Sequence, residues 1–275
     1  MHVADGLVRR VLVPALLLAA LAARATSYVV APASPGRSTS SHSASQLSQF
    51  PGIVLWAWER PEDLRFIDPR QVGVAFLAET LYLRGDEVIV RPRLQPLRVP
   101  PGTALMATAR IETSQTVRKP GPPVLSPAQR TQAARAIARL GRIPSVQAVQ
   151  IDFDASASER AFYRELVQEV RRGLPDSTAL SITALASWCE GANWLGGLPI
   201  DEAVPMLFRM GPDRREIIEH FRASGRFAAG ICNQSVGVST DELLGAMASG
   251  RRVYIFRPGK WSEQAVRAAL AGVKR

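Results

Sequence analysis

Two carboxylates stand out as the residues of this chain best suited to chemistry. Asp152 and Asp154 are two positions apart, and apolar Ile151 and Phe153 alternate with them. Side chains at positions i and i+2 of a strand point to the same face, so we expect both aspartates on one face together with Gln150. Two like charges held close raise the pKa of one carboxyl, which keeps a proton available for acid catalysis.

A structural role for the same two aspartates is equally open. Asp152 or Asp154 would then hold Arg110 or Arg209 in an ion pair inside the fold, or help to cap the helix that follows. The local pattern is the same under both interpretations.

The three histidines exclude several kinds of catalysis. His2 lies near the N-terminus, His42 in a Ser-rich stretch and His220 on an expected amphipathic helix. We therefore expect no Ser-His-Asp triad, no Cys-His pair, no metal site and no cofactor. A general acid or base must then be a carboxylate, a tyrosine or a lysine.

The charge of the chain is strongly positive and carried by arginine. The formal net charge is +10, and the lysines are Lys119, Lys260 and Lys274 alone. Either the composition reflects a biased genome, or the partner is anionic, such as an acidic polysaccharide or an envelope surface. A nucleic-acid partner is not expected, because the sequence contains neither a long basic run nor a recognition-module signature.

Short β-rich runs alternate with helical segments along the chain, which predicts parallel strands joined by crossover helices. Eight such runs predict a small closed (β/α)8 TIM-type barrel, with its site at the C-terminal ends of the strands. The runner-up is an open doubly wound sheet, although no Gly-rich phosphate loop follows any run. The expected strands are 53–59, 72–78, 104–112, 146–154, 179–186, 204–210, 227–232 and 252–257.

Helix starts and one hairpin complete the predicted order. Ser156 with Glu159, and Ser239 with Glu242, are capping boxes that open helices. Residues 80–90 predict a β-hairpin in place of the helix after the second strand. Further helices are expected to begin near three other capping residues, Ser126, Asp213 and Ser262.

The N-terminus has the pattern of an export signal. Arg9 and Arg10 precede an apolar run and an Ala-Arg-Ala site, so residues 1–25 predict a signal peptide with the mature chain starting near Thr26. Residues 26–50 form a Ser/Pro-rich spacer, and 51–275 the barrel domain. We expect a periplasmic or extracellular protein with no membrane span once the signal is removed. The alternative is an inner-membrane anchor through an uncleaved signal.

Several longer stretches resemble an uncharacterised family of exported bacterial proteins, a domain of unknown function. The resemblance covers most of residues 53–261 and implies a barrel similar to glycoside hydrolases, with no established activity. The stretches are 55–60, 150–163, 181–189, 204–211 and 237–242.

A more distant resemblance is to the chitinase-like barrels, in which an Asp-x-Asp-x-Glu run ends the fourth strand. Asp152 and Asp154 match the two aspartates, whereas Ser156 stands at the glutamate position. The resemblance therefore implies that the acid comes from another strand, Glu112 or Glu59.

The strand ends supply a set of candidate site residues. The expected catalytic residues are Asp152, Asp154 and Glu112. Tryptophan faces can stack on sugar rings, although large aromatic side chains are more often part of a core. The expected substrate-binding residues are Glu59, Trp58, Arg110, Trp188, Arg209, Asn233 and Trp261.

Two cysteines leave one question open. Cys189 and Cys232 of an exported chain could form a disulfide, or both could be buried thiols. They follow expected strands five and seven, which are not neighbours, so a loop would have to bring them together.

Two hypotheses about function come from these observations. The first is a carbohydrate-active barrel of the glycoside hydrolase type, in which the aspartates orient the substrate and Glu112 is the acid. The second is a non-catalytic barrel that binds saccharides or envelope partners. The oligomeric state is open.

Overall fold

The computed structural model describes residues 47–113, 121–191, 194–242 and 250–273. The expected signal peptide and most of the spacer lie outside the described residues. So does the helix that Ser239 and Glu242 were expected to open. Among the described residues, no helix combines the length and the apolar character that crossing a membrane requires.

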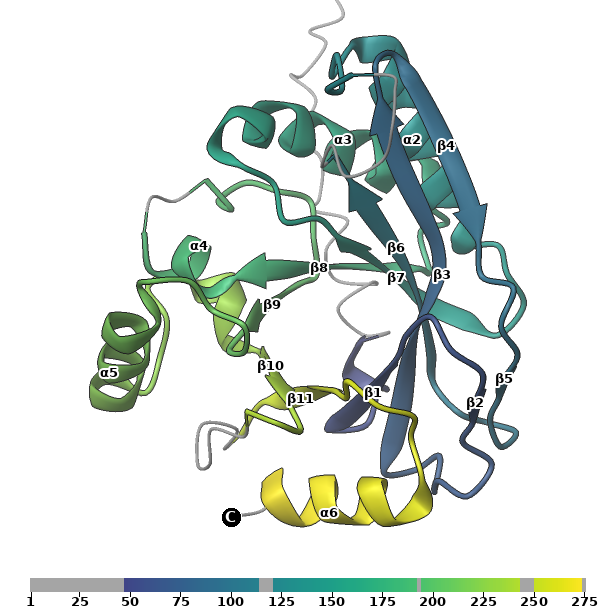
Figure 1. Cartoon of the computed structure of the whole chain (residues 1–275), viewed down its shortest axis with the longest axis vertical. Helices are drawn as coiled ribbons and strands as arrows, with labels where there is room; N and C mark the ends of the chain where they lie inside the picture. The colour runs from purple at the N-terminus through teal and green to yellow at the C-terminus, as the bar shows by residue number, and fades with distance from the viewer. Residues whose placement is uncertain (1–46, 114–120, 192–193, 243–249, 274–275) are drawn as a thin grey trace, which may run out of the picture. The chain divides into compact units, whose positions relative to one another are not determined.

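Eight parallel strands close into a barrel, which confirms the predicted fold class (Figure 1). The ring closes because β1 pairs in parallel with β11 on one side and with β3 on the other. In chain order the barrel strands are β1 (Ile53–Ala57), β3 (Val72–Arg84), β6 (Leu105–Glu112), β7 (Val146–Asp152), β8 (Ala179–Leu185), β9 (Glu202–Met206), β10 (Ser235–Ser239) and β11 (Arg252–Phe256).

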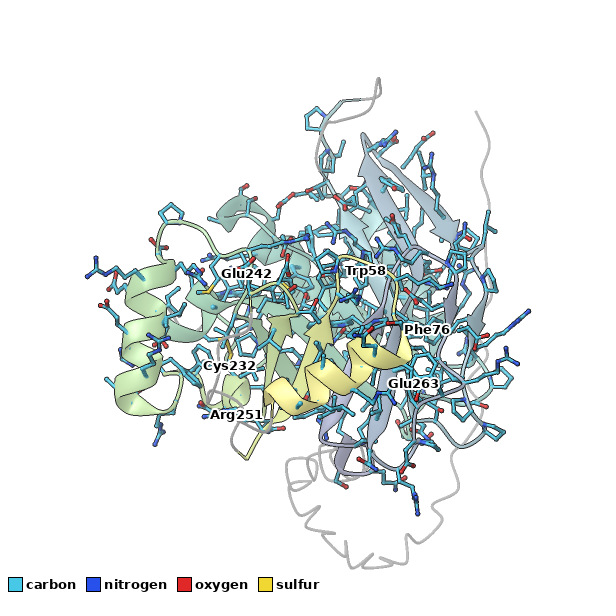
Figure 2. The ribbon with its side chains drawn as sticks, turned by 60° about the horizontal axis from the view of Figure 1, so that its bottom comes forward. Trp58, Phe76, Cys232, Glu242, Arg251 and Glu263 are labelled. Carbon is cyan, nitrogen blue, oxygen red and sulfur yellow. A yellow bond between two sulfur atoms is a disulfide. The ribbon has the colours of Figure 1, made fainter. Side chains whose placement is uncertain are left out.

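Helices follow most of the strands, and their caps agree with the sequence. Ser126 accepts a hydrogen bond from the Gln129 amide at the start of α2. Ser156 and Glu159 form the expected capping box before α3, and α2 and α3 pack side by side. The helices are α2 (Pro127–Leu140), α3 (Arg160–Gly173), α4 (Ala186–Glu190), α5 (Arg214–Ser224) and α6 (Glu263–Val273), the last with Glu263 labelled in Figure 2.

The predicted hairpin replaces the helix after the second barrel strand. β3 continues beyond the barrel to Arg84 and pairs with antiparallel β4 (Glu87–Pro92). Gly85 has φ +53° in the turn, a conformation that costs glycine little. The Gln129 side chain of α2 donates to the carbonyls of Gly85 and Glu87, which ties the hairpin to the helix layer. A short parallel pair, β2 (Glu62–Asp63) with β5 (Leu97–Arg98), lies beside this region.

Among the described residues, the seventh strand is an element that the sequence placed wrongly. The strand is β10 at Ser235–Ser239, and the expected run 227–232 is irregular and ends in the 3-10 helix η2 (Gly230–Asn233). The Asn233 side chain accepts from the Phe227 amide and donates to the Phe227 carbonyl, which closes this segment into a loop. Phe227 is fully buried, so the apolar run belongs to the core without being a strand.

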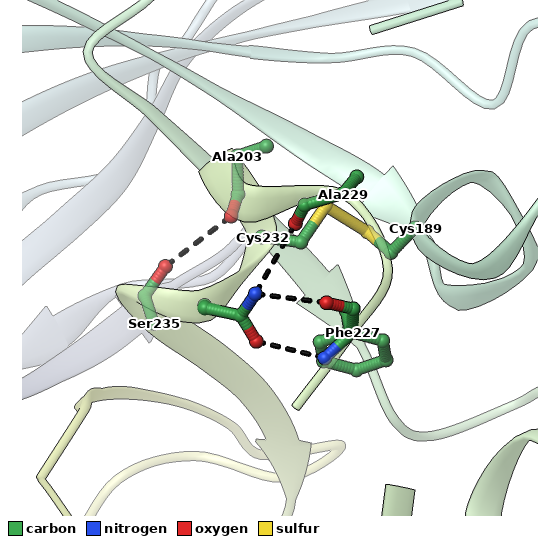
Figure 3. Close-up of a disulfide and its surroundings, with 7 residues drawn as sticks. Cys189, Ala203, Phe227, Ala229, Cys232 and Ser235 are labelled. Carbon is green, nitrogen blue, oxygen red and sulfur yellow. Dashed lines mark hydrogen bonds between the residues drawn. A yellow bond between two sulfur atoms is a disulfide. The ribbon is translucent and has the colours of Figure 1, made fainter. Parts of the chain in front are cut away.

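A disulfide joins the two cysteines (Figure 3). Cys189 lies on α4 and Cys232 on η2, with their Cα atoms 6.0 Å apart. The loop that begins at Phe227 precedes β10, so η2 lies against β9. β9 is the neighbour of both β8, which α4 follows, and β10. The amide of Ala229 also donates to the Cys189 carbonyl at 2.9 Å.

The packing at the N-terminal end of the barrel starts before the expected domain boundary at residue 51. Leu47 and Phe50 are buried among side chains of the barrel bottom such as Ala104. The guanidinium of Arg252 donates to the Leu47 carbonyl. The last residues of the expected spacer are therefore part of the folded body.

Candidate functional site

A layer of polar side chains crosses the barrel interior below the mouth. Gln150 of β7 accepts a hydrogen bond from the Trp56 indole at 2.9 Å and donates to Ser181 at 3.1 Å. Its neighbour Ile151 belongs instead to the core between the strands and the helices. Gln150 and Asp152 therefore share the inward face, as the alternation predicts.

The lowest part of the interior is closed by a buried ion pair. Glu202 accepts from the Arg252 guanidinium at 2.6 Å and from the Tyr254 hydroxyl at 2.6 Å. Ser181 connects Glu202 to Gln150 at 3.2 Å. These hydrogen bonds make the bottom of the barrel a packed polar core, and the open space lies above it.

The side chain of Trp56 forms the floor of that open space. It is buried, and its ring centroid lies 5.2 Å from that of Tyr254. Gly237 of β10 lies directly beneath the indole, since a Cβ there would approach Trp56 Cη2 to 2.8 Å. The absence of a side chain at 237 lets the tryptophan lie across the barrel.

A cavity of about 430 Å³ opens at the C-terminal ends of the strands. It contains five of the ten expected site residues, namely Asp152, Asp154, Arg110, Trp58 and Arg209. Its other lining residues are Trp56, Thr183, Leu185, Ala186, Ser187, Met206, Phe208, Met210, Gly211, Asp213, Arg214, Ile217 and Phe256.

Asp152 is buried and held by two partners. Its Oδ2 receives the Arg110 guanidinium at 3.1 Å, and its Oδ1 receives the Thr183 hydroxyl at 2.8 Å. Burial raises the pKa of Asp152, while Arg110 and Thr183 act in the opposite direction. The sequence left open whether the partner would be Arg110 or Arg209, and the structure has Arg110.

Asp154 follows the end of β7 and has a different environment. Its side chain is exposed, within the cavity lining. Desolvation in the mouth, followed by repulsion from Asp152, raises the pKa of Asp154 to about 6, although Arg110 lowers it. This carboxyl carries a proton at mildly acidic pH and is accessible to a ligand.

Glu112 is engaged by Arg110 outside the main cavity. The Arg110 Nε donates to Glu112 Oε1 at 2.5 Å, and the same guanidinium lies 5.9 Å from the centroid of the Trp58 ring. Glu112 lines a smaller adjoining pocket of about 220 Å³ that also includes Asp152 and Asp154. It is near the aspartates, but its carboxylate is already paired.

Half-buried aromatic rings form one wall of the cavity. The rings of Phe208 and Phe256 stack with an interplanar angle of 4° and centroids 5.6 Å apart. Trp58, labelled in Figure 2, meets Phe256 edge to face at 6.3 Å. We call Trp58, Phe208 and Phe256 the aromatic wall.

Two of the expected tryptophans lie elsewhere. Trp188 is buried against Tyr163 and Trp194 on the helix side of the barrel. Trp261 is also buried, and its indole donates to the Trp56 carbonyl at 3.0 Å. Neither lines the cavity, because both are part of the core around the strands.

Two polar candidates are also absent from the cavity lining. Asn233 precedes β10 and therefore lies at the opposite end of that strand from the mouth, where it closes the 227–233 loop. The substrate-binding role expected for Asn233 depended on the misplaced seventh strand. Glu59 is exposed and follows β1.

Several residues that line the cavity were not expected from the sequence. Phe208 and Phe256 stand at or just beyond the ends of β9 and β11, and Thr183 is the inward residue opposite Asp152. Arg214 comes from the start of α5. Alternation along the strands would have indicated Thr183, whereas the others depend on where each strand ends.

Ser156 serves as a helix cap rather than a cavity residue. Its amide and hydroxyl both donate to the Glu159 carboxylate at 2.7 Å. The third position of the chitinase-like run therefore carries no acid in this chain. Among the described residues, no cluster of three or more His, Cys, Asp or Glu is arranged to hold a metal ion.

No family model and no curated protein matches the chain. Among solved structures, the fold is similar to the chitinase domain of the spore coat protein CotE from Clostridium difficile, with a TM-score of 0.37 and 14% sequence identity. The match covers 58% of this chain and 52% of that one, so it spans about half the length of the neighbour. The fold class rests on the strand order and closure described above.

Proposed function

We propose that this protein is an exported carbohydrate-active barrel whose mouth binds a saccharide. The observation that carries the proposal is the aromatic wall, which presents half-buried rings to a cavity of about 430 Å³. Apolar faces of sugar rings pack on such surfaces, and Trp58 adds an indole N–H. Of the three buried tryptophans, Trp56 lines the cavity and forms its floor, whereas Trp188 and Trp261 do not line it.

Polar groups around the aromatic wall suit sugar hydroxyls. Asp154 offers an accessible carboxyl, and Arg209 and Arg214 offer donors. A few polar groups placed around an apolar cleft of this size are typical of small-ligand sites. Binding by this arrangement requires no catalytic step.

Glycoside hydrolysis is the second candidate, and the pKa of Asp154 favours it. A carboxyl with a pKa of about 6 retains its proton at mildly acidic pH, as a general acid must. Asp154 takes this role in place of Glu112, whose carboxylate is paired with Arg110. Both glycosidase geometries need a second carboxyl. Of the described carboxylates that line the cavity, Asp152 and Asp154 come from the end of β7, and Asp213 comes from the start of α5.

One variant tests both candidates. Asp154→Asn keeps the shape and removes the charge and the acidic proton. Binding and turnover are measured with purified protein on a polysaccharide panel. We expect loss of binding, or loss of turnover with binding retained if the barrel is a hydrolase. Asp176→Asn, at an exposed turn before β8, is the matched control and is expected to change neither.

Wild-type protein that binds and cleaves nothing on a broad panel would reject the proposal. Turnover unchanged in Asp154→Asn would remove Asp154 from the acid role and leave the binding site to be judged by affinity alone.

Export is the part of the proposal that rests on the first 25 residues. The supporting features are the basic start, the apolar run and the Ala-Arg-Ala site. Mass spectrometry of the protein recovered outside the cytoplasm is expected to give a chain starting near Thr26. An intact run 11–23 would instead support the inner-membrane anchor.

A further inference from the structure

Arg209 has an unusual backbone conformation at the rim of the mouth. It follows β9 with φ +50°, in the left-handed region that non-glycine residues seldom occupy. Such conformations persist where the surrounding structure holds them, and they gather at ligand sites. Its side chain is exposed and lines the cavity.

The loop after β10 holds this conformation in place. The Arg209 amide donates to both carboxylate oxygens of Glu242, at 3.2 and 3.3 Å. The Arg214 guanidinium at the start of α5 lies 3.9 Å from the same carboxylate. Glu242, labelled in Figure 2, therefore joins the β9 turn to α5 and holds the backbone from which the Arg209 side chain extends.

The guanidinium of Arg209 lies on the aromatic wall, with its central carbon 5.1 Å from the centroid of the Phe256 ring. Within the described part of the chain, it forms no side-chain ion pair. Arg110, by contrast, is occupied by both Asp152 and Glu112. A guanidinium stacked on a ring keeps its N–H edge free, and that planar edge matches a carboxylate with two parallel hydrogen bonds.

Three acidic side chains lie in the part of the mouth around Arg209, and each has its own contact or place. Asp241 interacts electrostatically with Arg209, and its carboxylate accepts the Ser239 hydroxyl. Asp213 is exposed beside Arg214 at the start of α5. Asp154 belongs to the end of β7, and β8 separates that strand from β9.

We infer that the saccharide is acidic, with a ring carboxylate bound by Arg209 while the ring packs on the aromatic wall. This inference rests on the proposed function, and it names the substrate class. Glu242 is the positioning residue, because it holds the backbone from which Arg209 reaches the cavity. The uncharged part of the saccharide extends toward Asp154, which keeps the two carboxylates in separate sectors of the mouth.

The test uses a matched pair of ligands. One is a disaccharide of one uronic acid and one neutral sugar, and the other is the same disaccharide with its carboxylate reduced to an alcohol. The full mature protein is expected to bind the acidic form roughly tenfold more tightly than the reduced form. Arg209→Gln is expected to remove this preference, because it lowers affinity for the acidic form much more than affinity for the reduced form.

Two further variants separate positioning from general damage. Glu242→Gln is expected to reduce the acidic-to-reduced affinity ratio without lowering affinity for the reduced form. Arg84→Gln removes another arginine that stacks on a ring, Tyr82, on the distant hairpin, and is expected to change neither affinity.

The outcomes distinguish this inference from the proposed function. Equal binding of both ligands by the wild type, or an equal loss for both in Arg209→Gln, would overturn the inference while saccharide binding stands. Binding of neither these nor any other saccharide would overturn the proposed function itself.

Discussion

Asp152 and Asp154 show how two identical side chains on one face acquire different properties. Asp152 is buried between Arg110 and Thr183, whereas Asp154 lies past the strand end and is exposed. The structural interpretation of the pair therefore fits Asp152, and a ligand-binding role is left to Asp154. Asp152, which is paired inside the barrel, and Asp154, which is accessible to a ligand, are only two positions apart in the chain.

The raised pKa of Asp154 predicts a pH-dependent effect on stability. The folded-state pKa is about 6 against an ordinary aspartate value of 3.8, so the folded state binds the extra proton between these values. Folding stability contributed by this group is present below pH 3.8 and lost as pH rises toward 6. Asp154→Asn removes the penalty, so its melting temperature should exceed that of the wild type at pH 8 and match it near pH 3.5.

Thermal unfolding across this pH range checks the prediction, with Asp152→Asn as the contrast. That change weakens a buried ion pair and is expected to cost about 3 kcal/mol, near the lower end of such losses because Glu112 remains with Arg110. A melting temperature for Asp154→Asn well below that of the wild type at pH 8 would show that Asp154 also supports the fold.

At the scale of elements, β10 shapes the mouth through a residue that has no side chain. Gly237→Ala would bring a methyl group to 2.8 Å from the Trp56 ring. The indole must then tilt toward the cavity, at an expected cost of about 1–3 kcal/mol in unfolding free energy. Saccharide affinity is expected to fall together with stability, because Trp56 is the cavity floor.

Gly52→Ala is the matched control for this substitution. A Cβ at position 52 meets no atom within 4 Å, so neither stability nor affinity should change. Denaturant unfolding and ligand titration of the two variants decide the point. Equal behaviour of Gly237→Ala and Gly52→Ala would mean that the floor tolerates displacement.

The disulfide joins helix α4 to the 3-10 helix η2. The double variant Cys189→Ser with Cys232→Ser opens the loop between two residues that are 43 positions apart. It is expected to lower the free energy of unfolding by about 2–4 kcal/mol. Thiol titration of unfolded, unreduced wild-type protein is expected to find no free thiol. Two titratable thiols in the exported protein would contradict the bridge.

At the scale of the whole molecule, the folded body includes residues that look like linker. Leu47 and Phe50 are about 4% and 5% exposed at the barrel bottom. A chain shortened to begin at Gly52 is expected to lose about 3–5 kcal/mol relative to one beginning at Ser45, from the two apolar side chains left unburied.

The double variant Leu47→Ala with Phe50→Ala provides the check in the full-length chain. It should reproduce most of the loss by denaturant unfolding, because it removes the same apolar contacts. No loss in either form would place the start of the stable body at or after residue 51.

Local sequence patterns predicted much of this fold for a physical reason. Strand alternation and helix caps depend on residues within a few positions of one another, so the eightfold order, the hairpin at 80–90 and the inward face of Asp152 followed from the chain alone. Both caps at Ser126 and Ser156 are equally local. The seventh strand was misplaced because Phe227 is apolar and buried in a loop that the Asn233 side chain closes, so its burial imitates that of a strand residue.

Only the tertiary structure decided which side chains share the cavity. Trp58, Trp188 and Trp261 all stand near strand ends in sequence, yet only Trp58 faces the mouth, because the others pack between strands and neighbouring segments. The choice of Arg110 over Arg209 as the partner of Asp152 depends on the pairing of β6 beside β7. Ring closure sets these distances through contacts between residues far apart in the chain, and the sequence pattern contains no measure of them.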